Sequence, residues 1–230
     1  VSIIEKAYMK VSGGYSFPGS NSGIDLFCLT GWIPEQVMFV EDQAKQHPSE
    51  QGKVRSNRQT EDRAWTRLQS AHKYGDCLIT IATGDLSQSE QTITGLVPGH
   101  AYAVLDVKDA GTLRMLKVKN PWARNPWVGR FSVDLTSHAC STTGTNDAGT
   151  GAPIPAAAPP RSGSGAEWTT GLLHHLQTSL AELKELQKSG VFWIEFSDCR
   201  KYFESFWLNW NPELFKYRTR IHGFWPKDQG

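Results

Sequence analysis

The sequence lacks the marks of several large classes of protein. Its net charge is only +1, with 24 Lys and Arg against 23 Asp and Glu scattered along 230 residues. A protein that binds nucleic acid or an anionic membrane surface normally concentrates basic charge, so neither partner is expected. No apolar run approaches the roughly 20 residues that span a bilayer, and no signal-peptide pattern opens the chain.

Cysteine is also scarce, and no two cysteines form a CxxC pair. Such spacing fits reduced thiols of the cytoplasm better than a disulfide framework or a zinc site. A hydrophobic content of 39% with 20% charged residues is typical of a soluble globular protein. The chain opens at Val1 in what reads as the middle of a fold, so we expect a fragment of a longer cytoplasmic protein. The four cysteines are Cys28, Cys77, Cys140 and Cys199.

Apolar periodicity predicts helices mixed with strands, without a regular βαβ alternation, which indicates an α+β fold. The stripe of residues 3–11 is expected to pack on the core of its own domain rather than on a partner. The leucines from Leu172 to Leu186 predict one amphipathic helix. Further helices are expected at 24–29, 64–74 and 199–203, and strands at 77–83, 101–107, 113–118, 192–196 and 206–210.

Two stretches are too polar to contribute to a core. Residues 41–62 contain Pro48, Gly52 and many Gln and Ser, which predicts a surface loop. Residues 139–167 consist almost entirely of Ser, Thr, Gly, Ala and Pro. Such a segment cannot bury enough apolar surface to offset its own ordering entropy, so we expect a disordered insertion.

The pattern that carries chemistry is a predicted hairpin with a His at one end and an Asn at the other. The turn sequence Asp109-Ala110-Gly111 joins its strands. A turn centred on Ala110 places His100 directly opposite Asn120, with backbones about 5 Å apart. The same register opposes Tyr102 with Val118, Val104 with Leu116, and Asp106 with Arg114.

An imidazole that meets a side-chain amide oxygen is held in one tautomer and one orientation. This is the orienting part of a Cys-His-Asn site, in which the His takes the thiol proton and later protonates the leaving amine. A strand-end His100 and an Asn120 that caps the turn before Pro121 would give the same spacing without catalysis. A slip of one residue would send the two side chains to opposite faces of the sheet.

Several motifs resemble the calpain family of cysteine proteases. Gly99-His100-Ala101-Tyr102 and Asn120-Pro121-Trp122 are similar to the family signatures around its catalytic His and Asn. Further motifs similar to calpains in general are Glu5-Lys6-Ala7-Tyr8, Gly13-Gly14-Tyr15, Trp127-x-Gly129-Arg130 and Gly190-Val191-Phe192-Trp193-Ile194. The resemblance is closest to the atypical PalB-type calpains, through Pro18-Gly19-Ser20-Asn21-Ser22, Leu29-Thr30-Gly31-Trp32-Ile33-Pro34 and Trp210-Asn211-Pro212-x-Leu214-Phe215.

The resemblance implies that residues 1–225 are the C-terminal part of a papain-like catalytic domain, built on an antiparallel sheet. His100 would be the general base and Asn120 its orienting residue. Trp122 would shield their hydrogen bond from water, although a Trp after Pro often simply packs in a core. Gly99 would lie beside the substrate backbone, because the absence of a Cβ lets a peptide approach closely.

The nucleophile is expected outside this chain. Gly75-Asp76-Cys77 looks like the family's sequence around the nucleophile, but Cys77 opens a predicted buried strand, where a thiol is inert. We therefore expect a first subdomain carrying the Cys as a partner, and protein substrates. His174-His175 could be a metal pair, but neighbours on a helix point about 100° apart, so we expect them to be solvated.

Two departures from conventional calpains concern calcium. Ala123 stands where they have Gly, and Pro126 stands where they place an acidic calcium ligand. Proline offers no side-chain oxygen to a hard cation, which argues against calcium in this half, although Asp134 lies near another acidic position of the family. No cofactor is firmly predicted.

The resemblance implies an intracellular cysteine endopeptidase to which this chain contributes half of the site. The chain alone is predicted to be inactive. The alternative is a non-catalytic calpain-like module with a binding or regulatory role.

Overall fold

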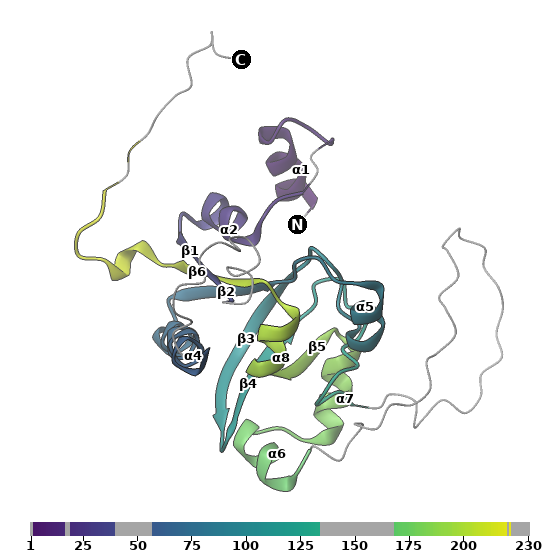
Figure 1. Ribbon diagram of the computed structural model, residues 1–230. Coiled ribbons are helices and arrows are strands. Elements are labelled where there is room, and N and C mark those ends of the chain that lie inside the picture. Colours follow the sequence, from purple (N-terminus) through teal and green to yellow (C-terminus); the bar gives the residue numbers. More distant parts are fainter. Residues whose placement is uncertain (1, 17–18, 40–56, 134–167, 220, 222–230) are drawn as a thin grey trace, which may run out of the picture.

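The computed structural model describes residues 2–16, 19–39, 57–133, 168–219 and 221. In this part of the chain, six strands form one sheet in the order β1-β6-β2-β3-β4-β5, and each neighbouring pair is antiparallel (Figure 1). The predicted α+β fold is confirmed. The strands are β1 (Ile33–Met38), β2 (Cys77–Ala82), β3 (Ala101–Ala110), β4 (Leu113–Lys119), β5 (Val191–Glu195) and β6 (Ser205–Trp210).

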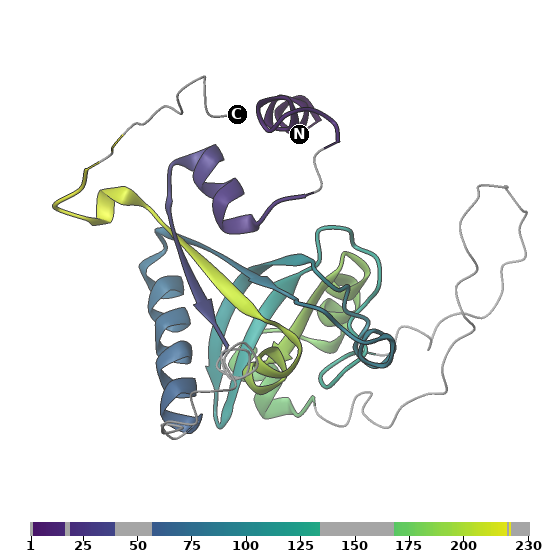
Figure 2. The ribbon, with the colours of Figure 1, turned by 45° about the horizontal axis from the view of Figure 1, so that its top comes forward.

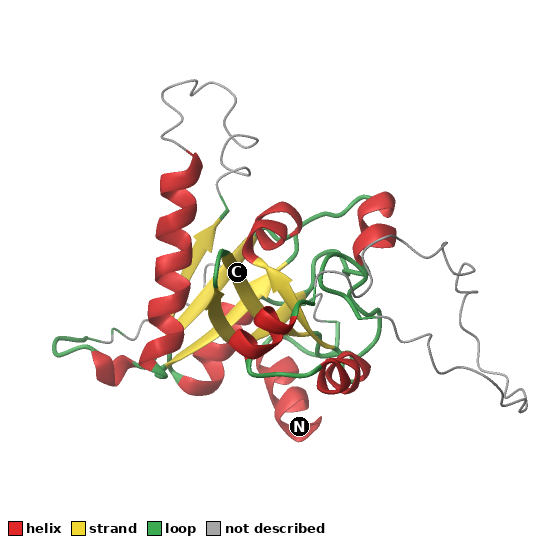
Figure 3. Cartoon of the chain, turned by 90° about the horizontal axis from the view of Figure 1, so that it is seen from below, coloured by secondary structure: helices red, strands yellow, loops and turns green. Residues whose placement is uncertain are grey.

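Helices lie on both sides of this sheet (Figure 3). None of the helices in the described ranges is long and apolar enough to cross a membrane. The helices are α1 (Ser2–Val11), α2 (Ser22–Thr30), α4 (Asn57–Tyr74), α5 (Gln88–Thr94), α6 (Thr170–Leu176), α7 (Leu180–Lys188), α8 (Phe196–Tyr202) and the 3-10 turn η2 (Pro212–Leu214).

The larger hydrophobic core lies between the sheet and helices α4 and α8. Figure 2 shows α4 running along one side of the strands. Because side chains alternate across a strand, every second residue of β2 and β6 reaches this core. The cluster includes Trp65 and Leu68 of α4, Ile81 of β2, and Phe206 and Leu208 of β6.

A second core covers the opposite face of β4 and β5. Met115 and Trp193 point into it, while their neighbours along the strands point into the first core. Leu172 and Leu176 of α6 and Leu183 of α7 close the cluster from outside. These two strands are therefore buried on both faces, which holds the β3–β4 hairpin and its ends in a fixed frame.

Helix α1 does not pack on the core as expected. None of its residues is buried, and Ile3 and Val11 are 84% and 89% exposed. Helix α1 contacts α2 through the Tyr8 hydroxyl, which donates to Asp25 Oδ1 at 2.5 Å. Within the described residues, the apolar stripe of α1 is thus left exposed.

The predicted polar loop at 41–62 is wrong for residues 57–62, because α4 begins at Asn57. Two acidic residues of this helix, Glu61 and Asp62, form ion pairs with other elements. Glu61 pairs with Arg200 at 2.8 Å and Asp62 with Arg114 at 2.6 Å. Residues 41–56 of the predicted loop, and the whole predicted insertion at 139–167, lie outside the described residues.

The single helix predicted from Leu172 to Leu186 is also wrong. Gln177 ends α6 with a left-handed φ of 54°, and the Ser179 side chain accepts a hydrogen bond from Glu182 N, which starts α7. Strand β1, helix α5 and the 3-10 turn η2 were not anticipated. Strand β1 contains Pro34, which an edge strand tolerates, and α5 begins with a capping box of Ser87 and Glu90, a signal that the sequence does carry.

Candidate active site

The β3–β4 hairpin is present, but its predicted register is wrong. Ala110 pairs with Leu113, so the turn is the two-residue Gly111-Thr112, with Gly111 at a φ of 69°, rather than a turn centred on Ala110. Arg114 consequently faces Asp109 and not Asp106, a displacement of three residues. The pairs predicted for Tyr102, Val104 and Asp106, and the direct opposition of His100 and Asn120, are therefore incorrect.

A β-bulge nevertheless returns the two site residues to one face. The register shifts between Val104 and Asp106, so that Val104 faces Val118, a displacement of two residues from the predicted pairing with Leu116. Because facing alternates along a strand, an even displacement preserves the face and an odd one reverses it. His100 and Asn120 thus meet as diagonal neighbours instead of opposed ones.

The contact itself is a hydrogen bond of 3.1 Å between His100 Nε2 and Asn120 Oδ1. Asn120 is 1% exposed, and its Nδ2 donates to the Arg124 carbonyl at 2.7 Å. Its Oδ1 also accepts from Trp122 N at 3.0 Å. Because Nδ2 must face a carbonyl and Oδ1 an N–H, the amide cannot be flipped. His100 therefore carries its proton on Nε2, and Nδ1 keeps a free lone pair.

The loop after Asn120 is shaped by unusual backbone angles and by one glycine. Ala123 and Asn125 have φ of 51° and 54°. Asn120 N donates to the Gly190 carbonyl at 2.8 Å. A Cβ on Gly190, whose φ is 80°, would lie 2.7 Å from Ala123 Cα and 2.9 Å from Asn120 O. The backbone of the loop after Asn120 thus packs directly against the backbone of Gly190, the residue before β5.

Two aromatic side chains contact the imidazole of His100. The Trp122 ring lies 4.2 Å from the His100 ring, centroid to centroid, at an interplanar angle of 43°. Trp122 is 57% exposed, which argues against a role as a core residue. Tyr102 is buried, and its ring contacts His100 edge-on at 4.9 Å. The imidazole is therefore restricted in rotation and partly covered.

Gly99 has open space around it. Beyond Gly99 itself and its two chain neighbours, no described heavy atom lies within 4 Å of the position that a Cβ would take, and its φ is 58°. Its N–H donates to the Gly84 carbonyl at 3.0 Å. The backbone angle alone favours glycine here, and the free space beside it leaves room for an approaching chain.

None of the described cysteines hydrogen-bonds to His100. Cys77 starts β2, whereas Ala82 at the other end of that strand pairs with Ala101, next to His100. Five residues of strand separate the two ends by roughly 17 Å. Burial raises the pKa of the Cys77 thiol to about 12, which keeps it protonated and inert.

The other two described thiols differ from each other. Cys199 is completely buried in α8, and burial raises its pKa well above the usual value. Cys28 is exposed on α2. Cys140 lies outside the described residues.

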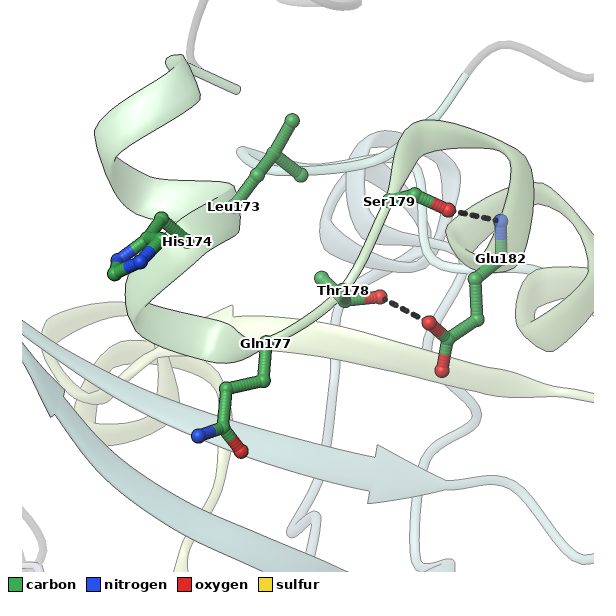
Figure 4. A pocket seen from close by; sticks show the side chains of 6 residues that line it. All are labelled: Leu173, His174, Gln177, Thr178, Ser179 and Glu182. Atoms are coloured by element: carbon green, nitrogen blue, oxygen red, sulfur yellow. Dashed lines mark hydrogen bonds between the residues drawn. The ribbon is translucent and has the colours of Figure 1, made fainter.

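The described part of the chain holds no cluster of three or more His, Cys, Asp or Glu side chains that could bind a metal ion. Asp134 lies outside it. His174 and His175 are both exposed, with ring centroids 6.4 Å apart. His174 lines a hollow of about 400 Å³ at the corner between α6 and α7 (Figure 4). Polar side chains that line this hollow bond to one another, as in the 3.0 Å hydrogen bond from Thr178 Oγ1 to Glu182.

Comparison with known proteins agrees with the sequence motifs. Residues 1–142 match the family described as "Calpain family cysteine protease". The chain is 38% identical to human (Homo sapiens) "Calpain-7" over 230 residues, which are 100% of this chain and 23% of that protein. It is 37% identical to "Calpain-like protease palB/RIM13" of Aspergillus oryzae over 228 residues, 99% of this chain and 20% of the relative. The chain thus spans less than a quarter of the length of these relatives.

Proposed function

Because the chain belongs to the calpain family of cysteine proteases, we propose that it supplies the general base and the orienting amide of a Cys-His-Asn site that hydrolyses peptide bonds. His100 is the base and Asn120 is the residue that orients it. The observation that carries the proposal is the 3.1 Å hydrogen bond between His100 Nε2 and the Oδ1 of a buried, fully bonded Asn120.

The chemistry follows from which ring nitrogen is free. Since Nε2–H is donated to Asn120, Nδ1 of His100 accepts the proton of the nucleophilic thiol. The thiolate attacks the scissile carbonyl carbon, and the amine leaves with the proton from Nδ1 as a thioester forms. Nδ1 then takes a proton from water, and the hydroxide attacks the thioester carbonyl. The carbon–sulfur bond breaks, the acid is released, and Nδ1 returns its proton to the departing thiolate, which restores the thiol and the neutral imidazole.

Asn120 and Trp122 act on the charge that this cycle places on the imidazole. When His100 is protonated at both nitrogens, Asn120 Oδ1 stabilises the Nε2–H dipole and keeps the ring aimed. Trp122 lies over the ring and displaces water from one side of it, and a hydrogen bond is electrostatically stronger in drier surroundings. Gly99 leaves space for the substrate backbone beside the base.

The nucleophile is proposed to come from a preceding subdomain that packs on this chain. The raised pKa of Cys77 and the complete burial of Cys199 argue against either as the nucleophile. The uncovered apolar stripe of α1, with Ile3 and Val11 exposed, offers a surface for such a partner. Proteins are the proposed substrates, and no step is routed through a calcium ion. Because none of the described cysteines is proposed as the nucleophile, the alternative stays open: a non-catalytic calpain-like module whose preceding subdomain lacks the Cys.

The test uses the full-length protein and a thiol-directed epoxide probe. We expect the probe to label a Cys upstream of this chain, and His100→Ala to abolish both labelling and peptide hydrolysis while the protein stays folded. The isolated chain should not be labelled at an active site. Labelling of one of its own cysteines that depends on His100 would contradict the half-site, and a Ser or Gly at the upstream position would favour the non-catalytic module.

A further inference from the structure

Thr83, directly after β2, has a buried hydroxyl that none of the steps above uses. The residue is 3% exposed, and a buried hydroxyl requires partners. Its Oγ1 accepts from His100 N at 2.9 Å and lies 2.6 Å from the Val97 carbonyl and 3.2 Å from the His100 carbonyl. A hydroxyl has one proton to donate, and the shorter distance assigns it to Val97.

The main chain of Thr83 completes the arrangement. Its N–H donates to the His100 carbonyl at 3.0 Å, so a single residue binds both backbone groups of His100. His100 directly precedes β3. The pairing of β3 with β2 ends at Ala101, the first residue of β3, which faces Ala82. Beyond the last β2–β3 pair, the Thr83 side chain therefore supplies the hydrogen-bond acceptor for His100 N.

The segment before His100 is tied at further points to the same frame. Val97 N donates to the Tyr102 hydroxyl at 3.0 Å, while the Val97 carbonyl accepts from Thr83. Gly99 N donates to the Gly84 carbonyl at 3.0 Å. The 97–100 segment carries Gly99 at a positive φ and has no helix or strand of its own, so these contacts fix its path.

We propose that Thr83 is a positioning residue whose hydroxyl holds the 97–100 segment so that the His100 imidazole points at Asn120. Without the hydroxyl, the amide of His100 and the carbonyl of Val97 lose a buried partner, and the segment shifts to find water. A shift of the His100 backbone moves Nε2 away from Asn120 Oδ1. The consequence for catalysis rests on the proposed function, but the consequence for the imidazole does not.

Three substitutions separate this role from a general loss of stability. Thr83→Val keeps the shape and removes the hydroxyl, whereas Thr83→Ser keeps the hydroxyl and removes a methyl group. Thr80→Val is the matched control, because Thr80 lies in β2, three residues before Thr83, and its hydroxyl pairs with Ser22 Oγ at 2.6 Å. Should Thr83→Val fail to fold, Thr83→Ala, which adds no atom to the buried site, takes its place under the same criteria.

The first readout is the Nε2–H proton of His100, observed by NMR in the labelled chain with the thermal melting of each variant as a check of folding. We expect Thr83→Val to exchange this proton at least about tenfold faster than the wild type, and Thr83→Ser and Thr80→Val to exchange it at the wild-type rate. A folded Thr83→Val with wild-type exchange and chemical shift overturns the positioning role, whatever the protein's activity.

The second readout is turnover of a peptide substrate by the full-length protein. Misplacement of a catalytic group by about 1 Å costs up to about 100-fold in rate, so we expect Thr83→Val to lower kcat about 10- to 100-fold with KM little changed. Thr83→Ser and Thr80→Val should keep the wild-type kcat. Equal kcat in all four proteins overturns the inference, whereas a wild type without turnover but with the NMR effect contradicts only the proposed function.

Discussion

Gly190 is the position at which one added carbon should disturb the candidate site most selectively. It precedes β5, has a φ of 80°, and its carbonyl accepts from Asn120 N. In Gly190→Ala the new Cβ would lie 2.7 Å from Ala123 Cα and 2.9 Å from Asn120 O. Both neighbours are backbone atoms that no side-chain rotation can remove, so the loop that holds Asn120 must move.

The loss of stability has two parts that a matched variant separates. A left-handed φ costs a non-glycine residue about 1–2 kcal/mol, and overpacking costs about 1–3 kcal/mol more. Gly111→Ala is the control: its φ is 69°, with nothing within 4 Å of the new Cβ, so it carries the first part only. For a chain of this size 1 kcal/mol lowers Tm by about 2–4 °C, so Gly190→Ala should melt about 2–12 °C below Gly111→Ala.

The assay combines thermal unfolding of both variants with NMR of the His100 imidazole. In Gly190→Ala the Nε2–H signal should shift or broaden, because Asn120 Oδ1 is displaced from it. In Gly111→Ala, at the far end of the hairpin, the signal should remain as in the wild type. Equal melting temperatures and an undisturbed imidazole in Gly190→Ala would refute the close fit between this glycine and the Asn120 loop.

Three further predictions follow from individual contacts. Asn120→Asp turns the donor to the Arg124 carbonyl into an acceptor, so urea unfolding should report a loss of about 1–3 kcal/mol; an unchanged midpoint would contradict the assigned amide orientation. With its pKa raised to about 12, only about one Cys77 thiol in 10⁴ is a thiolate at pH 8. Its alkylation, read by mass spectrometry, should therefore be far slower than that of exposed Cys28 and should rise about tenfold per pH unit up to pH 10. Fast modification of Cys77 at pH 8 would show that its burial is wrong. Ala123→Gly removes the cost of a φ of 51°, about 1–2 kcal/mol, against about 0.4–1 kcal/mol of added unfolded-state entropy, so Tm should rise slightly; a clear fall would argue against the left-handed turn.

The sequence identified the family and the α+β sheet, and both are confirmed. It also located the two hairpin strands, because alternating Val, Leu and Tyr residues mark them clearly. The register failed because a two-residue turn at Gly111 and a bulge near Leu105 leave no distinct signal in the residue pattern. The meeting of His100 and Asn120 survived this error, since turn and bulge together displace the pairing by an even number of residues.

The contacts that support the site were harder to foresee. Thr83 meets Val97 and His100 only because β2 and the 97–100 segment end side by side, and a Thr at a strand end carries no chemical pattern. The orientation of Asn120 depends on the Arg124 carbonyl, which is presented by a left-handed turn at Ala123. The catalytic roles of His100 and Asn120, the partner subdomain and the extent of the domain over residues 1–225 remain predictions.

The most direct test of the account is the tautomer of His100 in the folded chain, read from the two imidazole nitrogens by two-bond ¹H–¹⁵N NMR at a pH where the ring is neutral. The hydrogen bond from Nε2 to Asn120 Oδ1 predicts a proton on Nε2 and a bare Nδ1, and Asn120→Ala should turn this into the mixture of a free histidine. A proton on Nδ1, or a wild-type ring that averages both tautomers, would contradict the role of His100 as an oriented base.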